Sequence, residues 1–117
     1  MSAQPAIAYK VLTSAQMAEL EEAGVFKGAP VDLADGYIHL STEAQLTETV
    51  DKHFAGQDNL HVVAVDLAVL AGAVKWEPSR GGQLFPHIYG DLPLSAALAY
   101  GPLHRDENGS VKLPVAG

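Results

Sequence analysis

The beginning of the chain combines an apolar run with a segment that has one apolar face. Residues 6–12 are apolar and partly β-branched, which is typical of a strand. Residues 14–23 place Met17 and Leu20 on one face and glutamates on the others, which is typical of a helix. Gly24 follows at a position where glycine often ends a helix. We therefore expect a strand that runs into a helix.

A second strand and helix follow the turn signal at residues 35–36, which are Asp and Gly. Residues 37–40 alternate as a strand with one buried face does. Residues 42–45 have the spacing of a capping box, so we expect a helix that begins there and continues to Gly56. Residues 60–66 form a nearly continuous apolar run, which predicts a strand at the centre of a sheet.

The remainder of the chain predicts further strands around an irregular segment. Residues 74–77 are expected to form a strand. Residues 78–93 are rich in Gly, Pro, Ser and other polar residues, which predicts a structured loop. A strand is expected over residues 95–103, and residues 106–109 predict a hairpin turn. Residues 110–113 are expected to pair back after this turn.

Length and composition are those of one globular domain. The 117 residues are 48% hydrophobic and 18% charged, and a chain of this size buries roughly two-thirds of its unfolded surface. We expect a single domain over residues 1–117, with its core within residues 6–103 and a hairpin or tail over residues 104–117. Residues 27–30 are expected to be a loop. The mixture of helices and strands predicts an α+β fold.

The composition disfavours several classes of protein. Without cysteine, the chain has no disulfide framework, thiolate metal site or cysteine nucleophile. A formal charge of -7, with only seven Lys and Arg, disfavours general nucleic-acid binding. No apolar stretch approaches the ~20 residues that span a bilayer. Residues 1–5 carry no basic side chain of the kind that begins a signal peptide, so we expect a cytoplasmic protein without a membrane role.

The first candidate site lies at the end of the strand predicted over residues 37–40. Alternation sends His39 to the face opposite Ile38, and Ser41 shares the face of His39 if the strand continues. Both side chains then lie beside the N-terminus of the next helix, where free N–H groups and the helix dipole favour an anion. The alternative interpretation is a surface histidine beside helix-capping residues, Ser41 and Thr42.

The second candidate site follows Trp76. Arg80 stands beside Gly81 and Gly82, and this pair allows backbone N–H groups to approach a ligand closely. A guanidinium forms two parallel hydrogen bonds with a phosphate or carboxylate, so the segment suits a small anionic ligand. Alternatively, Arg80 pairs with Glu77 and shapes the loop. Trp76 either stacks on a ring of the ligand or packs in the core.

The third candidate site lies within residues 84–93, where two prolines and a glycine constrain the backbone around His87 and Tyr89. Rigid presentation of polar side chains is typical of a functional site. The alternative is an aromatic plug over the core, with the hydroxyl of Tyr89 bonded to the backbone.

No complete catalytic motif is present, and a metal site has little support. His39 and His87, with Glu77 or Asp91, could supply two imidazoles and a carboxylate. These ligands have no fixed spacing along the chain. We therefore expect no metal.

Several motifs resemble those of a known bacterial family. They are Asp35-Gly36-Tyr37-Ile38-His39-Leu40-Ser41-Thr42, His53-Phe54-Ala55-Gly56-Gln57, Lys75-Trp76-Glu77, Ser79-Arg80-Gly81-Gly82 and Phe85-Pro86-His87-Ile88-Tyr89-Gly90. The family is the one called domain of unknown function 952, and the resemblance covers residues 9–103. That family is grouped by remote similarity with the ADP-ribosyltransferase superfamily, whose members bind NAD in a cleft of a split, mostly antiparallel sheet.

The resemblance implies both a fold and an activity. The implied fold is a split, mostly antiparallel sheet with two main helices, similar to that of the ADP-ribosyltransferases. Residues 38–41 resemble the His-Leu-Ser strand of the tRNA 2′-phosphotransferases, which use NAD to remove a phosphate from RNA. Tyr9 and Lys10 then occupy the position of the first-strand motif.

The first functional hypothesis is therefore a domain that binds NAD or a related nucleotide and transfers or hydrolyses its ADP-ribose. The candidate catalytic residues are His39, Glu77 and His87. The candidate ligand-binding residues are Tyr9, Lys10, Ser41, Thr42, Trp76, Ser79, Arg80, Gly81, Gly82 and Tyr89. The alternatives are a non-catalytic nucleotide-binding module and a metal-assisted hydrolase that uses His39 and His87. The first hypothesis requires that His39 and Arg80 face one cleft.

Overall fold

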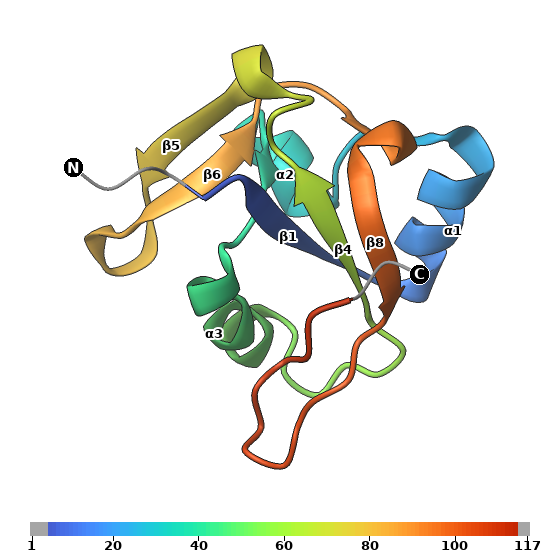
Figure 1. Cartoon of the computed structure of the whole chain (residues 1–117), viewed down its shortest axis with the longest axis vertical. Coiled ribbons are helices and arrows are strands. Elements are labelled where there is room, and N and C mark those ends of the chain that lie inside the picture. The colour runs from blue at the N-terminus through green and yellow to red at the C-terminus, as the bar shows by residue number, and fades with distance from the viewer. Residues whose placement is uncertain (1–4, 115–117) are drawn as a thin grey trace.

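The computed structural model describes residues 5–114, apart from the side chain of Arg80. This part of the chain forms three helices and eight strands (Figure 1). The helices are α1 (Ser14–Ala23), α2 (Pro30–Asp35) and α3 (Glu43–His53). The strands are β1 (Ile7–Leu12), β2 (Val25–Phe26), β3 (Ile38–His39), β4 (His61–Asp66), β5 (Val74–Pro78), β6 (Leu84–Ile88), β7 (Leu92–Pro93) and β8 (Ala97–Pro102). The predicted α+β class is confirmed.

The strands form two three-stranded sheets and one short pair, and every pairing between them is antiparallel. The sheet orders are β1-β4-β8, β3-β6-β5 and β2-β7. Tyr9 and Ser41 join the first two sheets, because each donates its backbone N–H to the carbonyl of the other, at 2.7 and 2.9 Å. This link brings β1 and the end of β3 together, and Figure 1 shows the β5–β6 pair beside β1.

Both faces of the first sheet are covered, so it contributes to two clusters of buried residues. The first core contains Ala8, Leu12, Met17, Leu20, Phe26, Ile38, Leu40, Val63, Val65, Leu67, Ile88, Leu92 and Ala96. The second core contains Tyr9, Val11, Leu46, Val50, Leu60, Val62, Ala64 and Val111. Alternate residues of β4 belong to different cores, which explains the continuous apolar run at residues 60–66. The predicted central position of β4 in its sheet is confirmed.

Local sequence signals predicted the two longer helices, although α3 ends at His53 and not at Gly56. Thr13 and Gln16 form a reciprocal capping box at the start of α1, with hydrogen bonds of 2.9 and 3.2 Å, and Gly24 ends this helix in the left-handed conformation. At the start of α3, the N–H of Thr42 donates to Oε1 of Gln45 at 3.0 Å. These caps satisfy backbone groups that have no partner inside the helix.

Two predicted loops contain regular structure instead. Residues 27–30 end in α2, which begins at Pro30, a residue suited to the first helical position. The chain therefore has a third, short helix that the sequence did not predict. Residues 78–93 contain β6 and β7, and β6 is the middle strand of its sheet. The sequence did not predict β6 because it contains Pro86, and proline lacks the N–H that a central strand donates. The carbonyl of Pro86 still accepts from the N–H of Leu40 at 3.0 Å.

The end of the described chain forms the predicted hairpin turn. Asp106 donates its backbone N–H to the carbonyl of Ser110 at 2.9 Å, and Arg105 and Val111 form a β-bridge. Val111 packs into the second core, so the returning segment covers α3 and β1.

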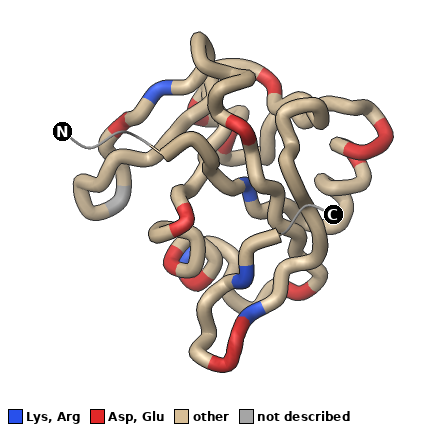
Figure 2. The backbone as a smooth tube through the Cα atoms, viewed as in Figure 1, with Lys and Arg blue, Asp and Glu red and all other residues tan. Residues whose placement is uncertain are grey.

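Figure 2 shows acidic residues spread around the molecule, in keeping with its negative charge. In the described part of the chain, no helix has the length and apolar character needed to cross a bilayer.

Candidate functional site

The β3-β6-β5 sheet has one core face and one face that carries ionisable and aromatic side chains. Ile38 lies opposite Ile88 in the register, and both side chains are buried in the first core. His39 and His87 are the next pair, so alternation sends both imidazoles to the other face. Their ring centroids are 5.3 Å apart. The structure therefore brings together two histidines that the sequence singled out separately.

The imidazole of His87 is buried and held in one orientation. Its ring stacks on that of Tyr37, with centroids 4.1 Å apart and planes 22° apart. Its Nδ1 lies 2.7 Å from Oε1 of Glu77. An ionised carboxylate only accepts hydrogen bonds, so Nδ1 carries a hydrogen, and in the neutral imidazole Nε2 presents a lone pair. The side chain is 2% exposed, and Nε2 has no hydrogen-bond partner among the described residues.

Glu77 is held in turn by a second donor. The hydroxyl of Tyr89 donates to Glu77, at 2.8 Å from Oε1 and 3.0 Å from Oε2. The hydrogen bond from His87, followed by that from Tyr89, lowers the pKa of Glu77. The same bond to Glu77, with partial burial, raises the pKa of Tyr89. Both partners therefore stay in the form that keeps the bond, with Glu77 ionised and Tyr89 protonated.

A buried network lies behind His39. Lys10 points to the same side of β1 as the core residues Ala8 and Leu12, so its ammonium needs a buried partner. Asp32 supplies it: Nζ of Lys10 lies 3.0 Å from Oδ2 and 3.2 Å from Oδ1, and it also donates to the carbonyl of His39 at 3.0 Å. Burial lowers the pKa of Lys10, and Asp32 opposes that effect.

Asp32 accepts from three further donors. They are Nδ1 of His39 at 2.6 Å and the backbone N–H groups of His39 and Ala29, at 3.1 and 2.8 Å. Burial alone would raise the pKa of Asp32, but His39, Lys10 and the two N–H groups outweigh it and lower the pKa to about 2. The network fastens α2 to β1 and β3.

This pKa predicts how stability depends on pH. The folded value of about 2 lies below the ordinary value of 3.8, so ionised Asp32 stabilises the fold above about pH 4. The contribution, roughly 2 kcal/mol, is lost as the pH falls from 4 towards 2. Urea unfolding between pH 2 and 7 should show this loss in the wild type. The Asp32→Asn variant should show a flatter dependence, and equal slopes below pH 4 would contradict the assignment.

His39 has little freedom to bind a ligand directly. Its Nδ1 faces Asp32, and its Nε2 lies 2.9 Å from Oδ2 of Asp35. The two contacts can both be hydrogen bonds only when both ring nitrogens of His39 carry hydrogen, because ionised carboxylates only accept hydrogen bonds. The outer contact is partly open to water, with side-chain exposures of 29% for His39 and 45% for Asp35. A ligand would therefore reach His39 only by replacing Asp35.

The two histidines line one cavity of about 720 Å³. Its walls come from β1, α2, the end of β3, the C-terminal half of α3 and β6. The lining residues are Tyr9, Lys10, Val11, Gln16, Ala29, Pro30, Val31, Asp35, His39, Leu40, Ser41, Thr49, His53, Phe54, Ser79, Phe85 and His87. This volume lies within the range of small-molecule sites. We name this cavity the histidine cleft.

Six candidate residues from the sequence line the histidine cleft. They are Tyr9, Lys10, His39, Ser41, Ser79 and His87. The hydroxyl of Ser41 also bonds that of Thr49 at 2.7 Å. Glu77 and Tyr89 do not line the cleft. Glu77 accepts from Nδ1 of His87, and Tyr89 donates to Glu77. Trp76 does not line the cleft but packs against the first core.

The remaining candidates belong to the loop before β6 and to a second cavity. Gly81 and Gly82 have φ angles of 69° and 78°, and the N–H of Gly82 donates to the carbonyl of Ser79 at 2.9 Å in a tight turn. Arg80 lies within this turn, but its side chain is outside the described part of the structure. The prediction that His39 and Arg80 face one cleft therefore stays a prediction. Thr42 lines the second cavity.

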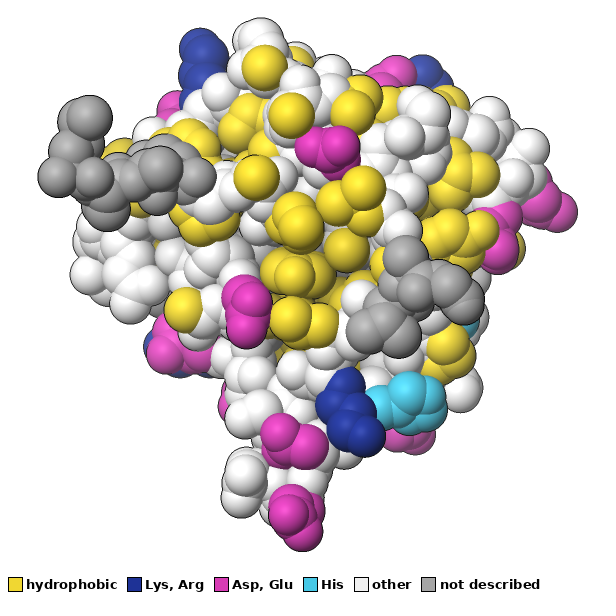
Figure 3. All heavy atoms as spheres, in the orientation of Figure 1, with side chains coloured by type: hydrophobic (Ala, Val, Ile, Leu, Met, Phe, Trp, Pro, Cys, Tyr) yellow, Lys and Arg dark blue, Asp and Glu magenta, His cyan; other side chains and the backbone are white. Residues whose placement is uncertain are grey.

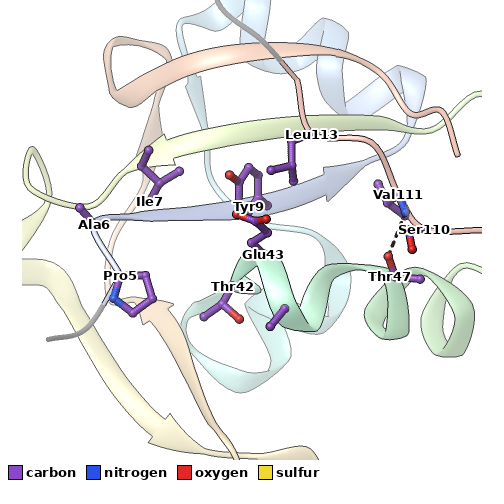
Figure 4. Close-up of a pocket in the computed structure, with 11 residues that line it drawn as sticks. Pro5, Ala6, Ile7, Tyr9, Thr42, Glu43, Thr47, Ser110, Val111 and Leu113 are labelled. Carbon is purple, nitrogen blue, oxygen red and sulfur yellow. Dashed lines mark hydrogen bonds between the residues drawn. The ribbon is translucent and has the colours of Figure 1, made fainter. Parts of the chain in front are cut away.

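The second cavity lies between β1, the start of α3 and the returning C-terminal segment (Figure 4). It measures about 840 Å³, and Tyr9 lines both cavities. Glu43 is the one charged residue among its lining residues, which are otherwise mostly apolar. Burial, and then the nearby charge of Glu43, raise the pKa of Tyr9. Figure 3 shows that hydrophobic side chains gather in the middle of the face seen in Figure 1.

Sequence reasoning missed α2 and its two acidic residues. Asp32 could have been anticipated, because alternation places Lys10 on a core-facing side of β1 and a buried ammonium requires a carboxylate. Asp35 was read only as part of a turn, yet it lines the histidine cleft and contacts His39. His53 was not among the candidate site residues, and it also lines the cleft. Within residues 5–114, no three acidic or histidine side chains are placed to hold a metal ion together.

Comparisons with known proteins agree with the family that the sequence motifs resemble. Residues 11–100 match the family described as "Protein of unknown function (DUF952)". The crystal structure of protein CC0527 from Caulobacter crescentus is 42% identical to this chain, with a TM-score of 0.82 over 91% of this chain and 93% of that one. A solution NMR structure of CC0527 is also 42% identical, with a TM-score of 0.77 over 92% and 91%. No curated protein has significant sequence similarity to the chain. The chain therefore belongs to the DUF952 family of proteins of unknown function.

Proposed function

We propose that the histidine cleft binds a small nucleotide ligand such as NAD or ADP-ribose, with a ligand hydroxyl donating to Nε2 of His87. The observation that carries the proposal is this buried nitrogen, which has no partner among the described residues and belongs to a side chain that lines the cleft. Leaving a buried acceptor without a hydrogen bond costs about 1–3 kcal/mol, and a ligand hydroxyl would recover that energy. A ribose presents hydroxyls suited to this role.

The surroundings of the cleft supply partners for the rest of such a ligand. Ser41 lines the cleft and carries a hydroxyl of the kind that hydrogen-bonds ligand oxygens. Ser79 also lines it, and the proposal keeps the prediction from the sequence that Arg80, the next residue, binds a phosphate of the ligand. The split antiparallel sheet supports a relation to the ADP-ribosyltransferase superfamily as part of the same proposal.

Asp35 is better placed than Glu77 to be the carboxylate that stabilises positive charge on a ribose. Departure of a leaving group from a ribose builds positive charge, which a nearby carboxylate stabilises. Both oxygens of Glu77 accept hydrogen bonds from Tyr89, and Glu77 does not line the cleft. Asp35 is the one acidic residue among those that line it.

The second candidate function is a binding module without catalysis. Two observations favour it: Lys10 is committed to Asp32, and both ring nitrogens of His39 face carboxylates. These groups stabilise the fold and are not free to act on a ligand. Release of nicotinamide from bound NAD separates the two candidates, because a module binds NAD and releases none. The metal-assisted hydrolase has no comparable observation in its favour.

Thermal unfolding with ligands tests the proposed binding. ADP-ribose or NAD at about 100 times its dissociation constant should stabilise the fold by about 2.7 kcal/mol and raise the melting temperature. The Arg80→Ala variant should lose most of this shift at the same ligand concentration, because it lacks the charge-assisted bond to phosphate.

The matched control is Arg105→Ala. Arg105 bonds the carbonyl of Gly109 and the carboxylate of Asp51, and it lines neither cavity. This variant should keep the full ligand-induced shift. No shift with either ligand in the wild type would rule out the proposal, and equal shifts in both variants would rule out the role of Arg80.

A further inference from the structure

The hydrogen bonds around His87 do more than prepare it to accept a bond from a ligand. Glu77 accepts from Nδ1, so the lone pair of the neutral imidazole lies on Nε2, and the side chain lines the histidine cleft. Tyr89 holds Glu77 through both carboxylate oxygens. A histidine whose second nitrogen is fixed by a carboxylate is the usual arrangement of a general base.

The orientation of this imidazole is fixed by the fold as well. His87 lies in the middle strand of its sheet, paired with His39 on one side and Lys75 on the other. Tyr37 covers one face of the ring, and its stacking geometry is nearly parallel. A proton acceptor needs this rigidity, because misplacement by about 1 Å is enough to slow proton transfer about a hundredfold.

We propose that His87 is a general base that removes a proton from a water molecule bound in the histidine cleft, and that Glu77 and Tyr89 are the residues that position it. This inference rests on the proposed function, since the ligand provides the electrophile. With NAD, the water oxygen forms a bond to C1′ of the ribose while the bond from C1′ to the nicotinamide nitrogen breaks. The bonding electrons leave with neutral nicotinamide. The proton lost by water passes to Nε2 and then to solvent, so the products are ADP-ribose, nicotinamide and one proton.

Glu77→Gln tests the positioning role. An amide can donate to Nδ1 as well as accept from it, so the lone pair would no longer be confined to Nε2. The rate of nicotinamide release at saturating NAD should fall by roughly 100-fold or more, whereas the dissociation constant for NAD should change little. Tyr89→Phe, which removes one donor to Glu77, should give a smaller loss.

Two further measurements distinguish positioning from a structural role. Nitrogen-15 NMR of the imidazoles should find hydrogen on Nδ1 of His87 in the wild type and a mixture of tautomers in Glu77→Gln. The control Lys75→Gln should keep both the wild-type rate and the wild-type tautomer. Lys75 lies over the ring of Tyr89, 4.6 Å from its centroid, and within the described part of the chain its side chain makes no hydrogen bond to Glu77 or His87.

The outcomes separate this inference from the proposed binding function. Binding of NAD without nicotinamide release in the wild type would overturn the general base and leave the binding proposal intact. Hydrogen on Nε2 of His87 in the wild type would overturn the general base whether or not NAD binds. Absence of binding would overturn both. Nicotinamide release that depends on Glu77, together with the Nδ1–H tautomer, would support the inference.

Discussion

Replacing Asp32 with alanine is expected to lower the free energy of unfolding by about 3–5 kcal/mol. The change removes the carboxylate that pairs with Lys10 and accepts from His39. It leaves an ammonium buried, with its side chain only 7% exposed, and this is a large destabilisation in any fold. Urea denaturation at pH 7 measures the effect directly.

Asp35→Ala is the matched control for this prediction. Asp35 also pairs with His39, but the pair is partly open to water and should contribute at most about 1 kcal/mol. The double variant Lys10→Met with Asp32→Leu should recover much of the stability lost by Asp32→Ala, because no buried charge is left without a partner. Similar losses for Asp32→Ala and Asp35→Ala would contradict the buried network described here.

The second large effect is expected from His87→Phe. Phenylalanine keeps a ring that can stack on Tyr37, but it removes Nε2, the buried nitrogen without a partner among the described residues. If a ligand hydroxyl donates to Nε2, the affinity for ADP-ribose should fall roughly tenfold or more. Titration calorimetry measures the dissociation constant in both proteins.

Two controls accompany this substitution. His104→Phe changes an exposed histidine that lines neither cavity, so it should leave the affinity unchanged. Circular dichroism should show that His87→Phe folds, since Glu77 is 35% exposed and water can replace the lost donor. Equal affinities of wild type and His87→Phe for ADP-ribose would remove the observation on which the proposed function depends.

The sequence predicted those parts of the fold that have strong local signals. The alternation at residues 37–40 and the nearly continuous apolar run at residues 60–66 each indicated correctly which side chains are buried. The capping residues Thr13 and Thr42 set the starts of the two longer helices. The short helix α2 was missed, because six residues carry too little periodicity to stand out.

Long-range pairing explains why the rest of the fold could not be predicted locally. β6 contains Pro86, and a proline argues against a central strand when only the sequence is considered. Its place between β3 and β5 depends on partners far away in the chain. The strand is possible because the carbonyl of Pro86 still accepts a hydrogen bond from Leu40.

The candidate site shows the same division between local and long-range information. Residue types and strand ends identified His39 and His87, and the cleft that they share is a result of strand pairing. Their hydrogen-bond partners could not be predicted, because Asp32 and Glu77 neighbour them only in the folded chain. The buried Lys10 likewise proved to be a partner of Asp32 and not a free cation.

A crystal structure with ADP-ribose bound tests the central claim most directly. We predict that a ribose hydroxyl will lie about 2.7–3.2 Å from Nε2 of His87, inside the histidine cleft, while Nδ1 keeps its bond to Glu77. The account would be contradicted by a ligand seated in the second cavity, beside Glu43 and Val111, with Nε2 of His87 still without a partner.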